Sequence, residues 1–63
     1  MKIMFRDWYN CEEEYHPIEL DELKKILAQC DAQNEYCEWG YFTIEIDKIE
    51  DSVWFVSKVY EGD

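Results

Sequence analysis

The sequence lacks any apolar run close to the length that a membrane span requires. Its beginning, MKIMFRDWYN, also lacks the apolar core of a secretory signal peptide, so we expect a cytoplasmic protein. Cysteine occurs three times, and an odd number argues against a closed disulfide framework and for a reducing compartment. Proline occurs once and glycine twice, and there is no linker, low-complexity tract or internal repeat. We therefore expect one small acidic domain over residues 1–63.

Basic residues are also scarce, with six Lys and Arg against sixteen Asp and Glu, which gives a net charge of −10. Such a field repels phosphate backbones and anionic membranes, which argues against direct nucleic-acid or membrane binding. The same field attracts cationic partners, and strongly cationic protein surfaces are commonly those that hold DNA or RNA. A hydrophobic content of 48% with 17% aromatic residues nevertheless indicates a folded chain.

The stretch from Tyr15 to Cys30 (YHPIELDELKKILAQC) predicts the only helix. Pro17 suits the first helical position, with His16 as the N-cap and Glu19 placed to complete a capping box. We expect the helix to fade between Cys30 and Asn34. Its apolar stripe, at helical spacing, comprises Leu20, Leu23, Ile26, Leu27 and Cys30.

Three stretches alternate as strands do, namely Lys2 to Tyr9, Tyr41 to Asp47 and Ser52 to Tyr60. Residues 48–51 form a polar turn, and Glu61 to Asp63 is a short acidic tail. The pattern predicts an α+β fold of order β-α-β-β. We expect a three-stranded antiparallel sheet in the order 1-3-2, with the single helix packed on one face and the other face open.

Charge decides the predicted orientation of the first and last strands. Ile3 and Phe5 are assigned to the core because the opposite face of that strand carries Lys2 and Arg6. In the last strand the face containing Ser57 is assigned to the core, because burying a hydroxyl costs less than burying an unpaired ammonium. That assignment gives the core Val53, Phe55, Ser57 and Val59. The open face is then aromatic, either a contact surface or self-packing, with Trp8, Tyr41, Thr43, Glu45, Trp54 and Tyr60.

Four residues could in principle bind zinc: Cys11, His16, Cys30 and Cys37. Their spacings are C-x4-H and C-x6-C, with no C-x2-C knuckle, and Cys30 is required on the apolar stripe. A small zinc module therefore stays an alternative, and we expect no metal and no cofactor. Cys11 or Cys37 with His16 could form a nucleophile pair, but nothing orients the imidazole, so we expect no enzyme.

The carboxylates themselves are the strongest candidates for a binding site. Alternate strand residues such as Glu45 and Asp47 stand roughly 6.6 Å apart. Helical neighbours such as Glu19 and Glu22 stand about 5–6 Å apart. Both spacings are near that of successive phosphates, so carboxylate rows can occupy a groove built for DNA; a solvated surface or a generic acidic interaction module are the alternatives. The candidate partner-binding residues are Glu12, Glu13, Glu14, Glu19, Asp21, Glu22, Glu35, Glu38, Glu45, Asp47, Glu50 and Asp51.

In size, charge and order of elements the chain resembles small acidic phage anti-CRISPR proteins, and among them the DNA-mimicking inhibitors of type I-C systems. The resemblance runs from MKIMFRDWY through HPIELDELKKIL to YFTIEID and VWFVSKVY. It implies a non-catalytic inhibitor, in the cytoplasm of an infected or lysogenic bacterial host, that binds the DNA-binding site of the CRISPR surveillance complex Cascade and blocks target DNA. Inhibitors of other phage-defence proteins that bind nucleic acid would share these features.

Overall fold

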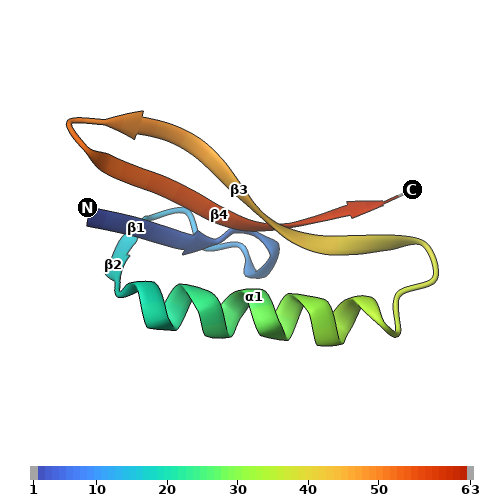
Figure 1. The fold of residues 1–63 in the computed structure, drawn as a ribbon. Coiled ribbons are helices and arrows are strands. Elements are labelled where there is room, and N and C mark those ends of the chain that lie inside the picture. The colour runs from blue at the N-terminus through green and yellow to red at the C-terminus, as the bar shows by residue number, and fades with distance from the viewer. Residues whose placement is uncertain (1, 63) are drawn as a thin grey trace.

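The computed structural model describes residues 2–62, which form a mixed four-stranded sheet and one α-helix (Figure 1). The sheet order is β2-β1-β4-β3. The general α+β class is as predicted. The elements are β1 (Lys2–Asp7), the 3₁₀ turn η1 (Trp8–Asn10), β2 (His16–Ile18), α1 (Leu20–Asn34), β3 (Gly40–Glu50) and β4 (Val53–Gly62).

The predicted three-stranded antiparallel sheet in the order 1-3-2 is wrong, because one strand was not foreseen. β2 pairs antiparallel with β1, so that Phe5 lies opposite His16. This short strand reverses the chain once more before the helix begins. Every later element therefore runs in the direction opposite to the predicted one. β4 consequently lies parallel to β1 and antiparallel to β3.

The predicted start of the helix is also wrong. His16 and Pro17 belong to β2, and the helix begins at Leu20, with Glu19 as its N-cap. Glu19 makes no capping hydrogen bond through its side chain, although its carbonyl oxygen accepts from the Leu23 amide at 3.1 Å. Proline fits β2 because this strand lies at the edge of the sheet, where one missing N–H is tolerated.

The core forms where α1 covers one face of the sheet. Ile3, Phe5 and Val56 form its central cluster of buried apolar side chains. Cys30 of α1 is buried as well, whereas Leu20 and Leu27 from the predicted stripe remain 47% and 43% exposed. The helix therefore presents a narrower apolar stripe than its sequence suggested. The side chains packed around the core are Ile18, Leu23, Ile26, Ile44 and Trp54.

The predicted faces of the last strand are reversed. The parallel register sets Ile3 beside Trp54 and Phe5 beside Val56, which turns this side of β4 toward the helix. Lys58 lies on the same side and is only 7% exposed, while Ser57 is buried on the opposite face. The Lys58 ammonium lies 5.0 Å from the ring centre of Phe42 and 6.0 Å from that of Tyr9. Trp54 therefore leaves the predicted open face, and Phe55 takes its place.

β3 and β4 form a long hairpin that extends beyond the predicted turn at residues 48–51. Its two-residue turn, Asp51 and Ser52, has positive φ values of 50° and 64°, as the tightest hairpin turns require. A bulge between Ile46 and Lys48 leaves Asp47 without a cross-strand partner. At the other end the predicted acidic tail is partly strand, because Glu61 and Gly62 belong to β4; Asp63 lies outside the described residues.

Candidate functional site

The twelve predicted carboxylate residues are all exposed and spread along the length of the molecule. The Cα trace measures 38 × 22 × 16 Å. Glu50 and Asp51 lie at the tip of the hairpin, whereas Glu35 and Glu38 follow α1 at the opposite end (Figure 1). The carboxylates therefore form an elongated acidic surface and not a single pocket.

Glu12, Glu13 and Glu14 share the connector between η1 and β2. Glu12 is held in place, since its Oε1 accepts a hydrogen bond from the Asp7 amide at 2.8 Å. The same oxygen lies 3.7 Å from Nε2 of His16. The three glutamates line a shallow, open hollow together with Tyr15 and His16. The connector thus has an ordered anchor at Glu12 and two freely solvated carboxylates.

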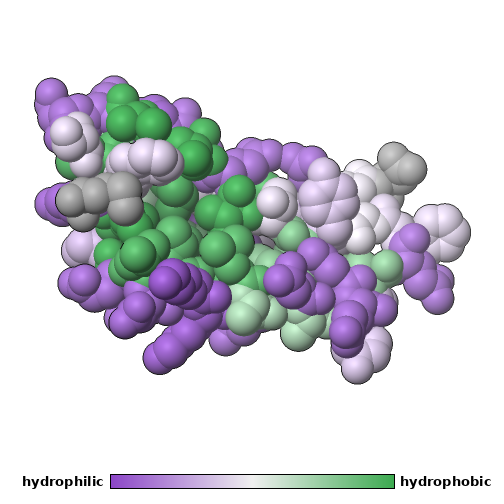
Figure 2. Space-filling view, in the orientation of Figure 1, coloured by the Kyte–Doolittle hydropathy of each residue, from purple (hydrophilic) through white to green (hydrophobic). Residues whose placement is uncertain are grey.

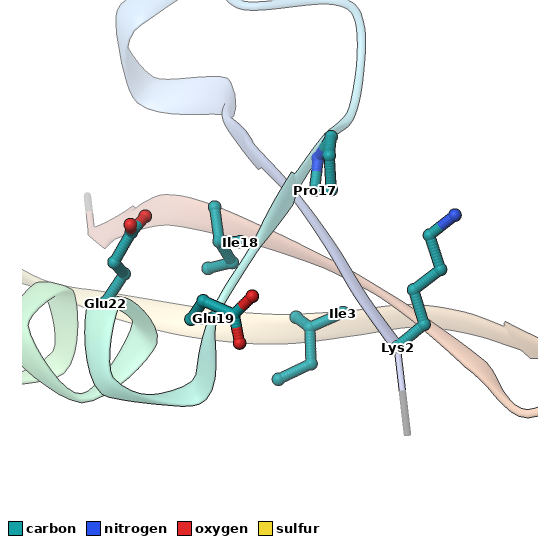
Figure 3. A pocket seen from close by; sticks show the side chains of 6 residues that line it. All are labelled: Lys2, Ile3, Pro17, Ile18, Glu19 and Glu22. Atoms are coloured by element: carbon teal, nitrogen blue, oxygen red, sulfur yellow. The ribbon is translucent and has the colours of Figure 1, made fainter.

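Glu19 and Glu22 come together where β2 leads into α1. They line one side of a half-open hollow whose remaining wall is supplied by Ile3, Ile18, Pro17 and Lys2. In Figure 3 the two carboxylates lie on one side and the Lys2 ammonium on the other. Asp21 and Glu22 occupy the first turn of the helix, where negative charge interacts favourably with the helix dipole. This group is partly explained by helix stability alone.

Asp47 is not a free surface carboxylate. Its Oδ2 accepts hydrogen bonds from the Tyr15 hydroxyl at 2.7 Å and from the Ser57 hydroxyl, and it lies 3.7 Å from Nη2 of Arg6. Arg6 Nε donates to Ser57 Oγ at 2.8 Å, and its guanidinium lies 4.6 Å from the ring centres of both Trp8 and Tyr15. Burial and the bond to Asp47 raise the pKa of Tyr15. We therefore remove Asp47 from the carboxylates free to bind a partner.

Glu45 has an acidic neighbour that the sequence did not indicate. Glu61 was assigned to a tail, but the β3–β4 ladder brings it opposite Tyr41, whose hydroxyl donates to Glu61 Oε2 at 2.8 Å. A shared hydrogen bond and the charge of Glu61 raise the pKa of Glu45, while the bonds from Glu45 and Tyr41 lower that of Glu61. Two carboxyl groups therefore meet on the open face. The pair forms because β4 continues as far as Gly62 and so includes Glu61.

Exposed aromatic residues accompany the carboxylates that follow α1. Tyr36 is 85% exposed and Trp39 is 74% exposed. Each of them directly follows a glutamate in the sequence, Glu35 and Glu38 respectively. Backbone bonds from Tyr36 to Gln33 and from Cys37 to Asn34 hold the start of this segment. The signal for this aromatic surface is the composition of the segment, EYCEW, which contains both residues.

The basic residues are distributed very differently from the acidic ones. Arg6 is engaged by Asp47 and by two aromatic rings, and Lys58 is buried. Lys48 lies 3.8 Å from Glu50 and 4.7 Å from the ring centre of Phe55. Lys2, Lys24 and Lys25 remain exposed. Arg6 is withdrawn together with Asp47, so it is the burial of Lys58 that leaves the outer surface more acidic than the composition alone implies.

The four candidate zinc ligands do not come together. Cys30 is buried under the sheet, Cys11 is exposed in the turn after η1, and Cys37 donates to the Gln33 carbonyl at 3.2 Å. The His16 ring packs edge-on against Phe5. Across residues 2–62, no three His, Cys, Asp or Glu side chains are arranged to hold a metal ion.

No family model, curated protein or solved structure matches the chain. Within residues 2–62, the helix is too short and too polar to cross a membrane.

Proposed function

We propose that this protein is a non-catalytic inhibitor that mimics DNA and occupies the DNA-binding site of a Cascade surveillance complex. One observation carries the proposal: the predicted carboxylates other than Asp47 lie on the surface along the length of the molecule, whereas the cation Lys58 is buried. A fold selected only for stability would gain by placing cations among the surface carboxylates, because like charges crowded on a small domain repel one another.

The dimensions support the same proposal. A length of 38 Å is close to one turn of B-DNA, which is about 34–36 Å. The carboxylates at both ends and along the open face thus extend over a comparable stretch of a cationic groove. A blocker of this kind needs no catalytic group, and its partner is a basic DNA-binding surface.

A gel-shift competition tests the proposal. A purified type I-C Cascade loaded with guide RNA is mixed with labelled target duplex and increasing amounts of this protein, at low and at high salt. We expect displacement of the duplex that weakens as salt rises, because electrostatic complementarity acts largely through the association rate. Reversing Glu13 and Glu14 to Lys, or Glu50 to Lys, should weaken displacement while the circular dichroism spectrum stays unchanged.

A control pair of substitutions changes the net charge in the opposite direction. Changing Lys24 and Lys25 to Glu should leave displacement intact or strengthen it. Binding of the protein and the duplex to Cascade at the same time would overturn the proposal. Unchanged displacement by both charge-reversed variants would do so as well.

A second candidate function is an acidic protein-interaction module, and the exposed Tyr36 and Trp39 favour it. Aromatic side chains are enriched among the residues that dominate protein interfaces. The variants Tyr36→Ala and Trp39→Ala distinguish the two candidates in the same competition. If they abolish partner binding while every charge reversal is silent, the interaction module replaces the DNA mimic.

A further inference from the structure

The two edges of the sheet are protected to very different degrees. At one edge, β2 contains only three residues, and one of them is Pro17, which has no N–H to offer. At the other edge, β3 contains eleven residues and no proline. Its last six residues, 45–50, are all exposed. A long edge strand of this kind can pair with another chain unless something covers it.

The structure itself indicates which backbone groups of β3 face outward. Phe42 donates its amide to Asn34 Oδ1 at 2.6 Å, and Asn34 Nδ2 donates to the Phe42 carbonyl at 3.1 Å. The side-chain amide of Asn34 thus pairs with β3 as a peptide group of a neighbouring strand would. Because outward-facing residues alternate along a strand, the main chains of Ile44 and Ile46 face the same edge.

Ile49 continues this outward set beyond the bulge. Glu50 and Val53 flank the two-residue turn and face each other, so Ile49, one position earlier, turns its main chain outward. Among residues 2–62, no hydrogen bond outside the strand ladders engages the main chain of Ile44, Ile46 or Ile49. We call these three residues the β3 edge.

An apolar surface lies beside the β3 edge. Ile46 and Ile49 are 53% and 54% exposed, and Leu20 and Leu27 of α1 also remain exposed. Figure 2 shows hydrophobic side chains gathered between the hairpin and the first half of the helix, surrounded by hydrophilic ones. Because Ile46 and Ile49 pair with Val56 and Trp54, their side chains lie on the helix side of the sheet.

The opposite side of the same strand is mainly acidic, since its one cation, Lys48, lies 3.8 Å from Glu50. Glu45 lies on the open face next to Glu61, and their mutual influence raises the pKa of Glu45. A strand added to β3 would alternate its side chains between these two environments. Every second side chain would meet the apolar surface, and the others would lie near Glu45 and Glu61, where a cation relieves the repulsion.

We propose that the β3 edge binds an extended segment of a partner protein in which apolar residues alternate with Lys or Arg, by adding it as a fifth strand. The proposal rests on the proposed function for the positive charge of the partner, and it adds a defined docking mode. A second copy of this chain fits poorly, because pairing would double the net charge of −10 and bring Glu45 and Glu50 against acidic counterparts.

Two synthetic peptides of identical composition test the docking mode. One has the order Lys-Val-Arg-Val-Lys-Val-Arg, and the other groups the same residues as Lys-Arg-Lys-Arg-Val-Val-Val. We expect the alternating peptide to bind at least about tenfold more tightly, because only it can place charge and apolar groups on opposite sides of one strand. Its binding should slow hydrogen exchange at the amides of Ile44, Ile46 and Ile49, measured by NMR on the wild-type protein.

A pair of variants at one position isolates the backbone contribution. Ile49→Pro and Ile49→Ala both shorten the side chain, but only the proline removes the outward-facing N–H. We expect the proline variant to bind the alternating peptide about tenfold more weakly than the alanine variant, with unchanged circular dichroism. The exchange measurement on the wild type does not depend on how either variant folds.

Four results would overturn the proposal. These are equal binding of both peptides, unchanged amide exchange at the β3 edge, equal binding of a neutral peptide with Gln in place of Lys and Arg, and dimerisation through β3 without peptide. Equal binding of the two basic peptides would leave the acidic-inhibitor function standing. Failure of any basic peptide to bind at low salt would instead count against both.

Discussion

The two faces of the sheet are stabilised by different physical means. Under α1, Ile3, Phe5 and Val56 exclude water by apolar packing. On the open face, Arg6 and Asp47 are joined through hydroxyl groups and aromatic rings. The first arrangement follows from hydrophobic burial, whereas the second depends on satisfying each polar group after it leaves water.

This difference separates structural carboxylates from those available for binding. Asp47 belongs to the polar network of the open face, so its charge is largely balanced within the fold. Glu13 and Glu14 make no such contacts in the described part of the chain and project from the connector. Counting acidic residues therefore overstates the binding surface around Asp47 and describes it well around Glu13 and Glu14.

The largest effect should come from the face under the helix. Phe5→Ala should lower the free energy of unfolding by about 3–5 kcal/mol, because it leaves a cavity at the centre of the core. The neighbouring change Met4→Ala, on the half-buried opposite face, should cost less. Chemical denaturation measures both. Equal losses would show that the two faces contribute equally, contrary to this comparison.

The next largest effect should come from the open face. Asp47→Ala should lower the free energy of unfolding by about 1–3 kcal/mol, since it removes the acceptor shared by Tyr15 and Ser57 and the partner of Arg6. The control Glu13→Ala should change it by less than about 0.5 kcal/mol. If both changes are silent in urea denaturation, the network is incidental and Asp47 returns to the binding candidates.

Lys58 is the exception on the apolar face, and replacing it sharpens the contrast. Lys58→Met should leave the free energy of unfolding unchanged or raise it by up to about 2 kcal/mol, because methionine avoids the cost of burying an ammonium. The exposed Lys48→Met is the control and should have little effect. A clear loss at Lys58 would mean that its contacts with the Phe42 and Tyr9 rings outweigh desolvation.

The smallest effect concerns the Glu45 and Glu61 pair. A raised pKa at Glu45 favours the folded state below its ordinary value of 4.5, and this contribution is lost as pH rises through the raised pKa. The lowered pKa of Glu61 acts oppositely, favouring folding above 4.5 and losing that contribution as pH falls through the lowered pKa. We expect little net change in stability near this pH.

The individual titrations nevertheless reveal the pair. Glu61→Gln should lower the pKa of Glu45 toward its ordinary value, because the competing carboxylate is gone. Carbon-13 chemical shifts of the side-chain carboxyl groups measure this directly. An unchanged titration of Glu45 in the variant would show that the two groups do not interact.

Several features were predictable from local pattern. The alternation around Ile3 and Phe5 correctly identified core positions, and the helical spacing of Leu23, Ile26 and Cys30 correctly identified the covered stripe. Both depend on periodicity within one element. The Glu45 and Glu61 pair was not predictable in this way, because it depends on how far β3 and β4 remain paired.

The sequence by itself determined the net charge, the α+β class and most positions of the apolar stripes, because these depend on composition and on the periods of strand and helix. Tertiary structure decided the direction of the strands. His16 and Pro17 look like a helix start locally, but pairing with β1 makes them a strand, and that extra reversal turns β4 parallel to β1. It also decided that Lys58 is buried and that Asp47 is paired with Arg6, since both depend on partners distant in the chain.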